Sequence, residues 1–114
     1  MDESTLKPLQ ILYVGSNSKF IDELKESSEL FVINQFDNGL KANSFINSDS
    51  PIDGIVCEAF MHGMNGLDYA KVLRSKDKFI KIPILIITFE KDAELFKKAL
   101  ASKGIIDDFY QYPV

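Results

Sequence analysis

The chain has 114 residues, of which 46% are apolar, and a formal net charge of −4 at pH 7. This length is enough for one domain with a real core, and the composition is that of a globular protein rather than a disordered one. The negative charge excludes a broad electrostatic surface for nucleic acid or for an anionic membrane. We expect residues 1–114 to form a single domain, with an extended or disordered tail at 1–8.

Cysteine content and hydropathy indicate the compartment. Cys57 is the single cysteine, so no internal disulfide can form, which fits a reducing environment. No run approaches the roughly 20 apolar residues that a membrane span needs, and the first ten residues lack the apolar core of a signal peptide. We therefore predict a cytoplasmic protein that binds neither membranes nor nucleic acid.

Apolar runs and helical periodicity alternate along the chain. The alternation predicts an α/β fold with three layers, in which helices cover both faces of a doubly wound, five-stranded parallel sheet. A flavodoxin-like strand order, 2-1-3-4-5, is the arrangement it favours, with any site at the carboxyl ends of the strands. The predicted strands are 9–14, 29–36, 52–58, 82–88 and 105–110, and the predicted helices begin with Ser18 as cap, after Asp37-Asn38-Gly39, at Gly66, and with Asp92 as cap, the last closing at Gly104.

Four segments carry a family resemblance. Glu58 ends the third predicted strand, and His62-Gly63-Met64-Asn65-Gly66-Leu67 begins four residues later. Taken in order with the segments at 36–42, 82–89 and 107–113, this pattern resembles the receiver domain of two-component response regulators over about residues 11–113. The resemblance implies the flavodoxin-like fold and a phosphoacceptor at the end of the third strand.

The departures from the family lie at the reactive centre. The resemblance places Gly15 and Ser16 where receivers have an acidic pair for Mg²⁺, and Glu58 where they have the phosphoacceptor aspartate. Tyr112 takes the position of the family's lysine. Thr88 matches the phosphate-binding hydroxyl, and Phe109 falls on the switch aromatic.

These departures predict loss of phosphoryl transfer. Mg²⁺ needs more than one carboxylate ligand in such a site, and Gly15 and Ser16 supply none. The extra methylene of Glu58 displaces the nucleophile by roughly 1 Å, and Tyr112 removes a cation from the phosphoryl oxygens. We expect no stable acyl phosphate, no tightly bound Mg²⁺ and no cofactor.

The roles of individual residues stay open at this stage. Glu58 is either a mimic of the phosphorylated aspartate, directed toward Thr88, or a tolerated carboxylate in a solvent-facing cleft. The Tyr112 hydroxyl either donates a hydrogen bond to Glu58 or lies in water. His62, with Glu58 and Glu90, is a weaker candidate for a metal site than for an ordinary loop residue.

The leading functional hypothesis is a receiver that works without phosphorylation, as a protein-interaction or regulatory module of a signalling pathway. The alternatives are a still-active receiver that uses another carboxylate, Asp53 being the nearest, or a flavodoxin-like binder of a small ligand. The family's fifth helix would follow Pro113, and its absence predicts exposed apolar surface near Leu12, Val14 and the first helix, with self-association, for example as a homodimer, or partial disorder at this edge. The expected interaction face comprises Phe96, Lys97, Lys98, Phe109 and Tyr110.

Overall fold

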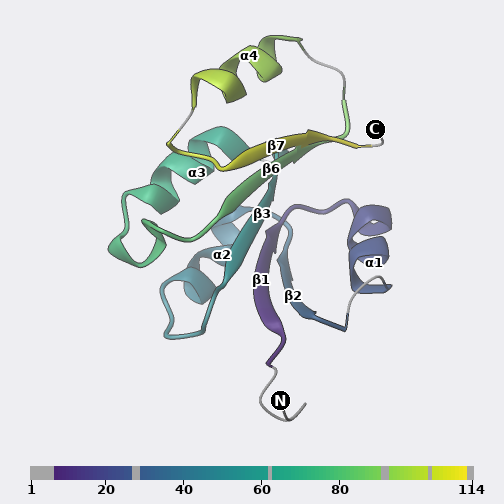
Figure 1. The fold of residues 1–114 in the computed structure, drawn as a ribbon, viewed down its shortest axis with the longest axis vertical. Coiled ribbons are helices and arrows are strands. Elements are labelled where there is room, and N and C mark those ends of the chain that lie inside the picture. The colour runs from purple at the N-terminus through teal and green to yellow at the C-terminus, as the bar shows by residue number, and fades with distance from the viewer. Residues whose placement is uncertain (1–6, 27–28, 62, 91–92, 103, 113–114) are drawn as a thin grey trace.

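A five-stranded parallel sheet in the order β2-β1-β3-β6-β7 forms the centre of the protein in this computed structural model, which describes residues 7–26, 29–61, 63–90, 93–102 and 104–112. Counted along the chain, these strands stand in the order 2-1-3-4-5, so the predicted flavodoxin-like α/β fold is confirmed. Figure 1 shows α1 on one face of the sheet and α2 and α3 on the other. The strands are β1 Leu9–Val14, β2 Phe31–Phe36, β3 Gly54–Glu58, β6 Ile84–Thr88 and β7 Asp108–Gln111, and the helices are α1 Ser18–Glu26, α2 Gly39–Ile46, α3 Gly66–Arg74 and α4 Ala93–Ala101.

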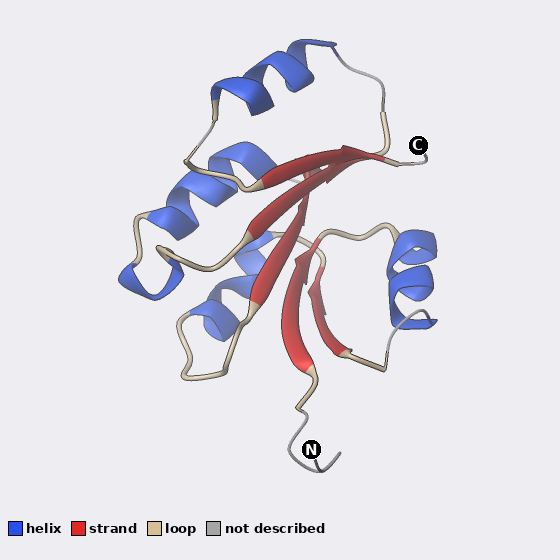
Figure 2. Ribbon diagram, viewed as in Figure 1, coloured by secondary structure: helices blue, strands red, loops and turns tan. Residues whose placement is uncertain are grey.

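Two small elements, a short hairpin and a 3-10 helix, were not predicted. Strands β4 (Phe60–Met61) and β5 (Met64–Asn65) pair antiparallel and form a short hairpin between β3 and α3. A 3-10 helix at Asp77–Phe79 follows α3. Figure 2 shows how the strands run together through the centre while the helices stay outside.

Four strands begin two or three residues later than predicted: β2 at Phe31 rather than at residue 29, β6 at Ile84 rather than at residue 82, and β3 and β7 as follows. Before β3 and β7, an aspartate carboxylate accepts from a backbone N–H of the neighbouring segment, beside a backbone hydrogen bond. The third strand begins at Gly54 rather than at residue 52, and the Asp53 carboxylate accepts a hydrogen bond from the Gln10 backbone N–H at 2.7 Å. The last strand begins at Asp108 rather than at residue 105. There the Asp107 carboxylate accepts from the backbone N–H of Ile84 at 2.8 Å.

Helix starts follow local capping, with one correction. Asn17, not Ser18, caps α1, because its Oδ1 accepts from the Phe20 N–H at 3.0 Å. Asn38 caps α2 as its turn signal predicts, accepting from the N–H of Lys41. The predicted cap at Asp92 lies outside the described residues, and Gly104 has a φ of +91°, which suits the turn beyond α4.

The main core lies between the sheet and helices α2, α3 and α4. Leu12 and Val14 are both fully buried in it. Leu12 and Val14 are therefore not themselves exposed, because their side chains point to the covered face of β1. On the other face, partly exposed Ile11, Val56 and Leu85 line a hollow of about 260 Å³. Self-association stays a prediction.

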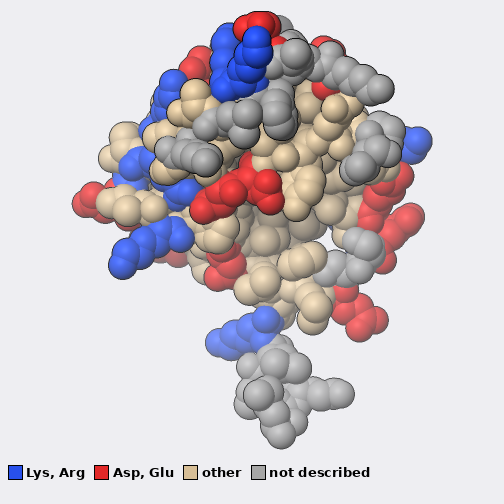
Figure 3. Space-filling model, turned by 45° about the horizontal axis from the view of Figure 1, so that its top comes forward, with Lys and Arg blue, Asp and Glu red and all other residues tan. Residues whose placement is uncertain are grey.

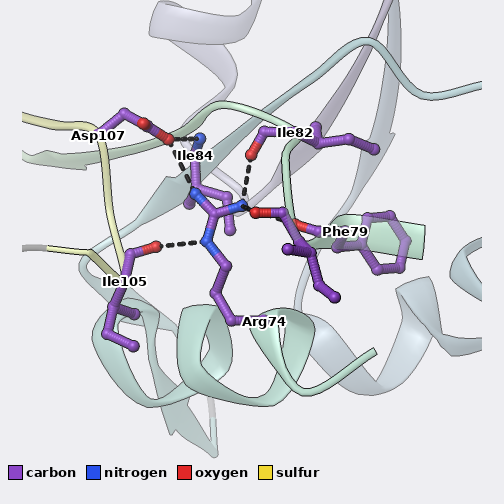
Figure 4. Close-up of polar contacts among 7 residues, drawn as sticks. Arg74, Phe79, Ile82, Ile84, Ile105 and Asp107 are labelled. Atoms are coloured by element: carbon purple, nitrogen blue, oxygen red, sulfur yellow. Dashed lines mark hydrogen bonds and ion pairs between the residues drawn. The ribbon is translucent and has the colours of Figure 1, made fainter. Parts of the chain in front are cut away.

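Arg74, the last residue of α3, fastens this helix to the chain segments that lead into β6 and β7 (Figure 4). Its guanidinium donates to the carbonyl oxygens of Phe79 and Ile82, both at 2.6 Å, and to that of Ile105 at 2.8 Å. It also pairs with Asp107 at 2.8 Å, and only 13% of the Arg74 side chain is exposed.

The described helices are short relative to the thickness of a lipid bilayer. None of those within the described ranges combines the length and the apolar character that a membrane span requires.

Candidate functional site

The carboxyl ends of β1, β3 and β6 meet at one edge of the sheet. Val14 lies beside Cys57, and Glu58 lies beside Ile87, so the residues at or just after these strand ends are neighbours. Gly15, Glu58 and Thr88 come together there. In doubly wound parallel sheets this edge is where ligands bind or reactions take place.

Glu58 is buried at this edge rather than facing solvent, with 6% of its surface exposed. Its Oε2 accepts a hydrogen bond from the Tyr13 hydroxyl at 2.5 Å and a second from the Asn17 backbone N–H at 2.9 Å. Asn17 caps α1, so the carboxylate lies at the positive end of that helix, where a negative charge is favourable. The solvent-facing reading of Glu58 is therefore wrong.

The Glu58 side chain fills the space that a side chain at residue 15 would need. A Cβ built on Gly15 would stand 2.1 Å from the Glu58 Cδ and 2.4 Å from its Cγ, far inside van der Waals contact. Gly15 also has a backbone φ of +152°, which residues other than glycine rarely adopt. The Glu58 side chain can therefore take this position only because residue 15 is a glycine.

Tyr13 completes the surroundings of Glu58, and the sequence analysis did not include it. Its side chain is fully buried, and this burial, followed by the hydrogen bond to Glu58, raises the pKa of Tyr13 far above its ordinary value. The hydroxyl therefore keeps its proton and acts as a donor. The available signal was position, because Tyr13 lies near the carboxyl end of β1, the strand that pairs with the Glu58 strand β3.

Comparison with known proteins agrees with this architecture. The family model of the response regulator receiver domain matches residues 16–109, which is most of the chain. The chain belongs to the response regulator receiver domain family. A search of curated proteins found no match.

Solved receiver structures share the fold at low sequence identity. A structure described as a response regulator from Chloroflexus aurantiacus J-10-fl is 20% identical, with a TM-score of 0.79 over 94% of this chain and 87% of that one. The non-phosphorylated HemR receiver domain from Leptospira biflexa is 21% identical, with a TM-score of 0.73 over 95% and 84%. CheY4 of Vibrio cholerae is 20% identical, with a TM-score of 0.75 over 95% and 89%.

The residues of this receiver do not fit the Mg²⁺ ion that the family implies. Mg²⁺ prefers an octahedral shell of oxygen ligands that includes carboxylates. Here Gly15 has no side chain, Ser16 is exposed with only a hydroxyl, and one Glu58 oxygen already accepts two hydrogen bonds. Among the described residues, no group of three His, Cys, Asp or Glu side chains could hold a metal ion, and His62 lies outside them.

Tyr112 takes part in a different contact from the one predicted. Its hydroxyl hydrogen-bonds the carboxylate of Glu23 on α1, and this contact raises the pKa of Tyr112. The hydroxyl therefore follows neither of the two readings, since it bonds Glu23 rather than water or Glu58, whose carboxylate is held by Tyr13 and Asn17. The Tyr112 ring packs edge-on against Phe20, with centroids 4.9 Å apart, and Phe20 in turn packs against Phe89 at 5.6 Å.

Thr88 is buried, and its hydroxyl is used locally. Its Oγ1 donates to the Glu90 carbonyl at 3.3 Å and accepts from the Glu90 N–H at 3.2 Å. The hydrogen bonds of Glu58 run toward β1 and α1 instead, which is not the direction that mimicry of a phosphorylated aspartate toward Thr88 requires.

The residues of the predicted interaction face are only partly brought together. Lys97 and Lys98 are exposed on α4, and the Phe96 side chain lies outside what the structure describes. Phe109 packs against the core, while Tyr110 is half exposed. Because successive strand residues point to opposite sides of a sheet, Phe109 and Tyr110 do not share one side. The interaction face stays a prediction.

Proposed function

We propose that this receiver domain works without accepting a phosphoryl group, as a protein-interaction or regulatory module within a two-component signalling protein. The observation that carries the proposal is the buried Glu58 carboxylate, held by Tyr13 and Asn17 in the space beside Gly15. Those two hydrogen bonds already stabilise the negative charge of Glu58 at this edge of the sheet. The residues at positions 15 and 16, Gly and Ser, offer no carboxylate to hold a cation.

Physical chemistry of phosphoryl transfer supports this reading. Transfer to a carboxylate depends on positioning the nucleophile and on neutralising charge on the phosphoryl oxygens. Glu58 Oε2 is turned into the domain, and Tyr112, at the position of the family's lysine, is a neutral group engaged with Glu23. Neither requirement is met by the described residues of the site.

Asp53, the alternative acceptor, is less suitable. It precedes the first residue of β3, at the opposite end of the strand from Glu58, and its carboxylate accepts from the Gln10 N–H. A reaction there would disturb the hydrogen bond between this carboxylate and the Gln10 backbone. Protein partners, rather than nucleic acid, remain the class that the net charge of −4 favours.

We expect no phosphoryl adduct on the protein after incubation with Mg²⁺ and acetyl phosphate, measured by intact mass. Restoring the family's residues with Gly15→Asp, Ser16→Asp, Glu58→Asp and Tyr112→Lys together should give a donor-dependent adduct, because a metal site, a shorter nucleophile and a cation return together. Glu58→Asp alone is the control and should stay unmodified.

The location of any adduct decides between the hypotheses. An adduct on Glu58 of the unmodified protein would contradict the proposal, and one mapped to Asp53 would favour the still-active alternative. Circular dichroism of each variant verifies that the fold is kept.

A further inference from the structure

A groove lies between α3 and α4, away from the Glu58 site. Its volume of about 540 Å³ falls in the range typical of binding pockets. Leu67, Leu95, Ala101 and Ile105 supply much of its apolar lining, and Phe60 of the β4–β5 hairpin lies at its edge. Phe60 is 48% exposed, and Met64 of the same hairpin is 39% exposed. Such apolar exposure beside a groove is typical of surfaces that bind other proteins.

Acidic and basic residues line different parts of this groove. Asp68 of α3 and Glu94 of α4 lie in the first turns of their helices, and Lys71 and Lys98 lie about one turn further along. The two helices run in the same direction, because each connects neighbouring strands of a parallel sheet. The groove is therefore acidic at one end and basic at the other.

The charges are accessible for an incoming partner. All of Asp68, Lys71, Glu94 and Lys98 are exposed. In Figure 3, basic and acidic side chains are seen together on the side of the molecule that carries α3 and α4. Glu94 forms an ion pair with Lys97 at 3.7 Å, in which both side chains are more than 70% exposed. Exposed pairs of this kind are weak and are readily exchanged.

We propose that this groove binds an amphipathic helix of a partner protein, lying antiparallel to α3 and α4. Such a helix would place an acidic residue against Lys71 and Lys98 and, one turn further along, a basic residue against Asp68 and Glu94, because the charges of the groove are only about one turn apart. That order, an acidic residue one turn before a basic one, also stabilises the partner helix itself, and the antiparallel direction opposes the dipoles of α3 and α4. Apolar side chains at helical spacing would contact Leu67 and Leu95.

This proposal rests on the proposed role in protein interaction, and not on the loss of phosphoryl transfer. It names a different surface from the face predicted at Phe109 and Tyr110. A second copy of this domain is a poor occupant through α1, because that helix has no acidic residue in its first turn.

The test uses two labelled helical peptides and fluorescence anisotropy. The first peptide has Leu on one face, flanked by Glu one turn before Lys, and the second has the same composition with the Glu and Lys positions exchanged. We expect the first to bind about tenfold more tightly, because the charge pairs differ by about 1.4 kcal/mol in all. Amide shifts of Leu67 and Leu95 should report its location.

Charge variants make the test specific. Lys71→Glu with Lys98→Glu makes both ends of the groove acidic, so the preference between the two peptides should disappear. The matched control is Lys19→Glu with Lys25→Glu, which makes the same change in net charge at exposed residues of α1 that do not line the groove, and it should keep the original preference. For the unmodified protein, equal affinity for both peptides, no binding of either, or shifts confined to another surface would overturn the proposal. Each of these results leaves the mass measurement of phosphorylation unaffected, so the two proposals fail separately.

Discussion

Gly15→Ala should lower the free energy of unfolding by about 3 kcal/mol, through overlap of the new methyl group with Glu58 and through backbone strain. The new Cβ would meet Glu58 Cδ at 2.1 Å, and the Glu58 side chain cannot easily move away, because Tyr13 and Asn17 hold it. Urea unfolding followed by circular dichroism measures the change.

A double-mutant cycle separates overlap from strain. In a Glu58→Ala background the overlap is gone, so Gly15→Ala should then cost only about 1 kcal/mol from its φ. Gly63→Ala is the matched control, since Gly63 has a φ of +81° but a Cβ added there would meet no atom within 4 Å. Its cost should be the same with either residue at position 58. If Gly15→Ala cost the same in both backgrounds, Gly15 and Glu58 would not be coupled.

Arg74→Met should lower the free energy of unfolding by about 3 kcal/mol, because it removes charged donors from several backbone carbonyls at once. The guanidinium is the donor to Phe79, Ile82 and Ile105, and Met keeps most of the apolar stem while leaving those oxygens without this partner. Arg74→Lys should restore only part of the loss, because one ammonium cannot reproduce the planar set of donors. Urea unfolding again provides the measurement.

Two controls separate the carbonyl contacts from the ion pair. Lys71→Met, at an exposed residue of the same helix, should change stability by less than about 0.5 kcal/mol. Asp107→Asn should cost only about 1 kcal/mol, since the Asp107 side chain is 57% exposed. A loss in Asp107→Asn as large as that in Arg74→Met would show that the ion pair, and not the set of carbonyl contacts, carries the stability.

The order of elements was predictable because apolar periodicity and turn residues are local properties of the sequence. Asn38 illustrates this, since its cap on α2 depends on residues a few positions away. Strand starts were less predictable, because Asp53 and Asp107 satisfy backbone N–H groups of residues far along the chain. Contacts of this kind leave no periodic signal.

The candidate site was located by family resemblance, but its internal contacts were not predictable. Motif spacing brought Gly15, Glu58 and Thr88 to one edge of the sheet, as observed. The donors to Glu58 depend on which way its side chain turns, and the space beside Gly15 decides that. Tyr112 was assigned by its position in the family pattern, yet a glutamate on α1, Glu23, determines where its hydroxyl bonds.

The central claim is that Glu58 occupies this site in place of a cation and its ligands. A Mg²⁺ titration followed by ¹⁵N–¹H correlation spectra tests it most directly, because the Asn17 amide donates to Glu58 and reports any change there. We predict that the amides of Asn17 and Glu58 show no saturable shift at millimolar Mg²⁺, while the variant with the restored acidic pair does. Saturable shifts at those amides in the unmodified protein would contradict the account.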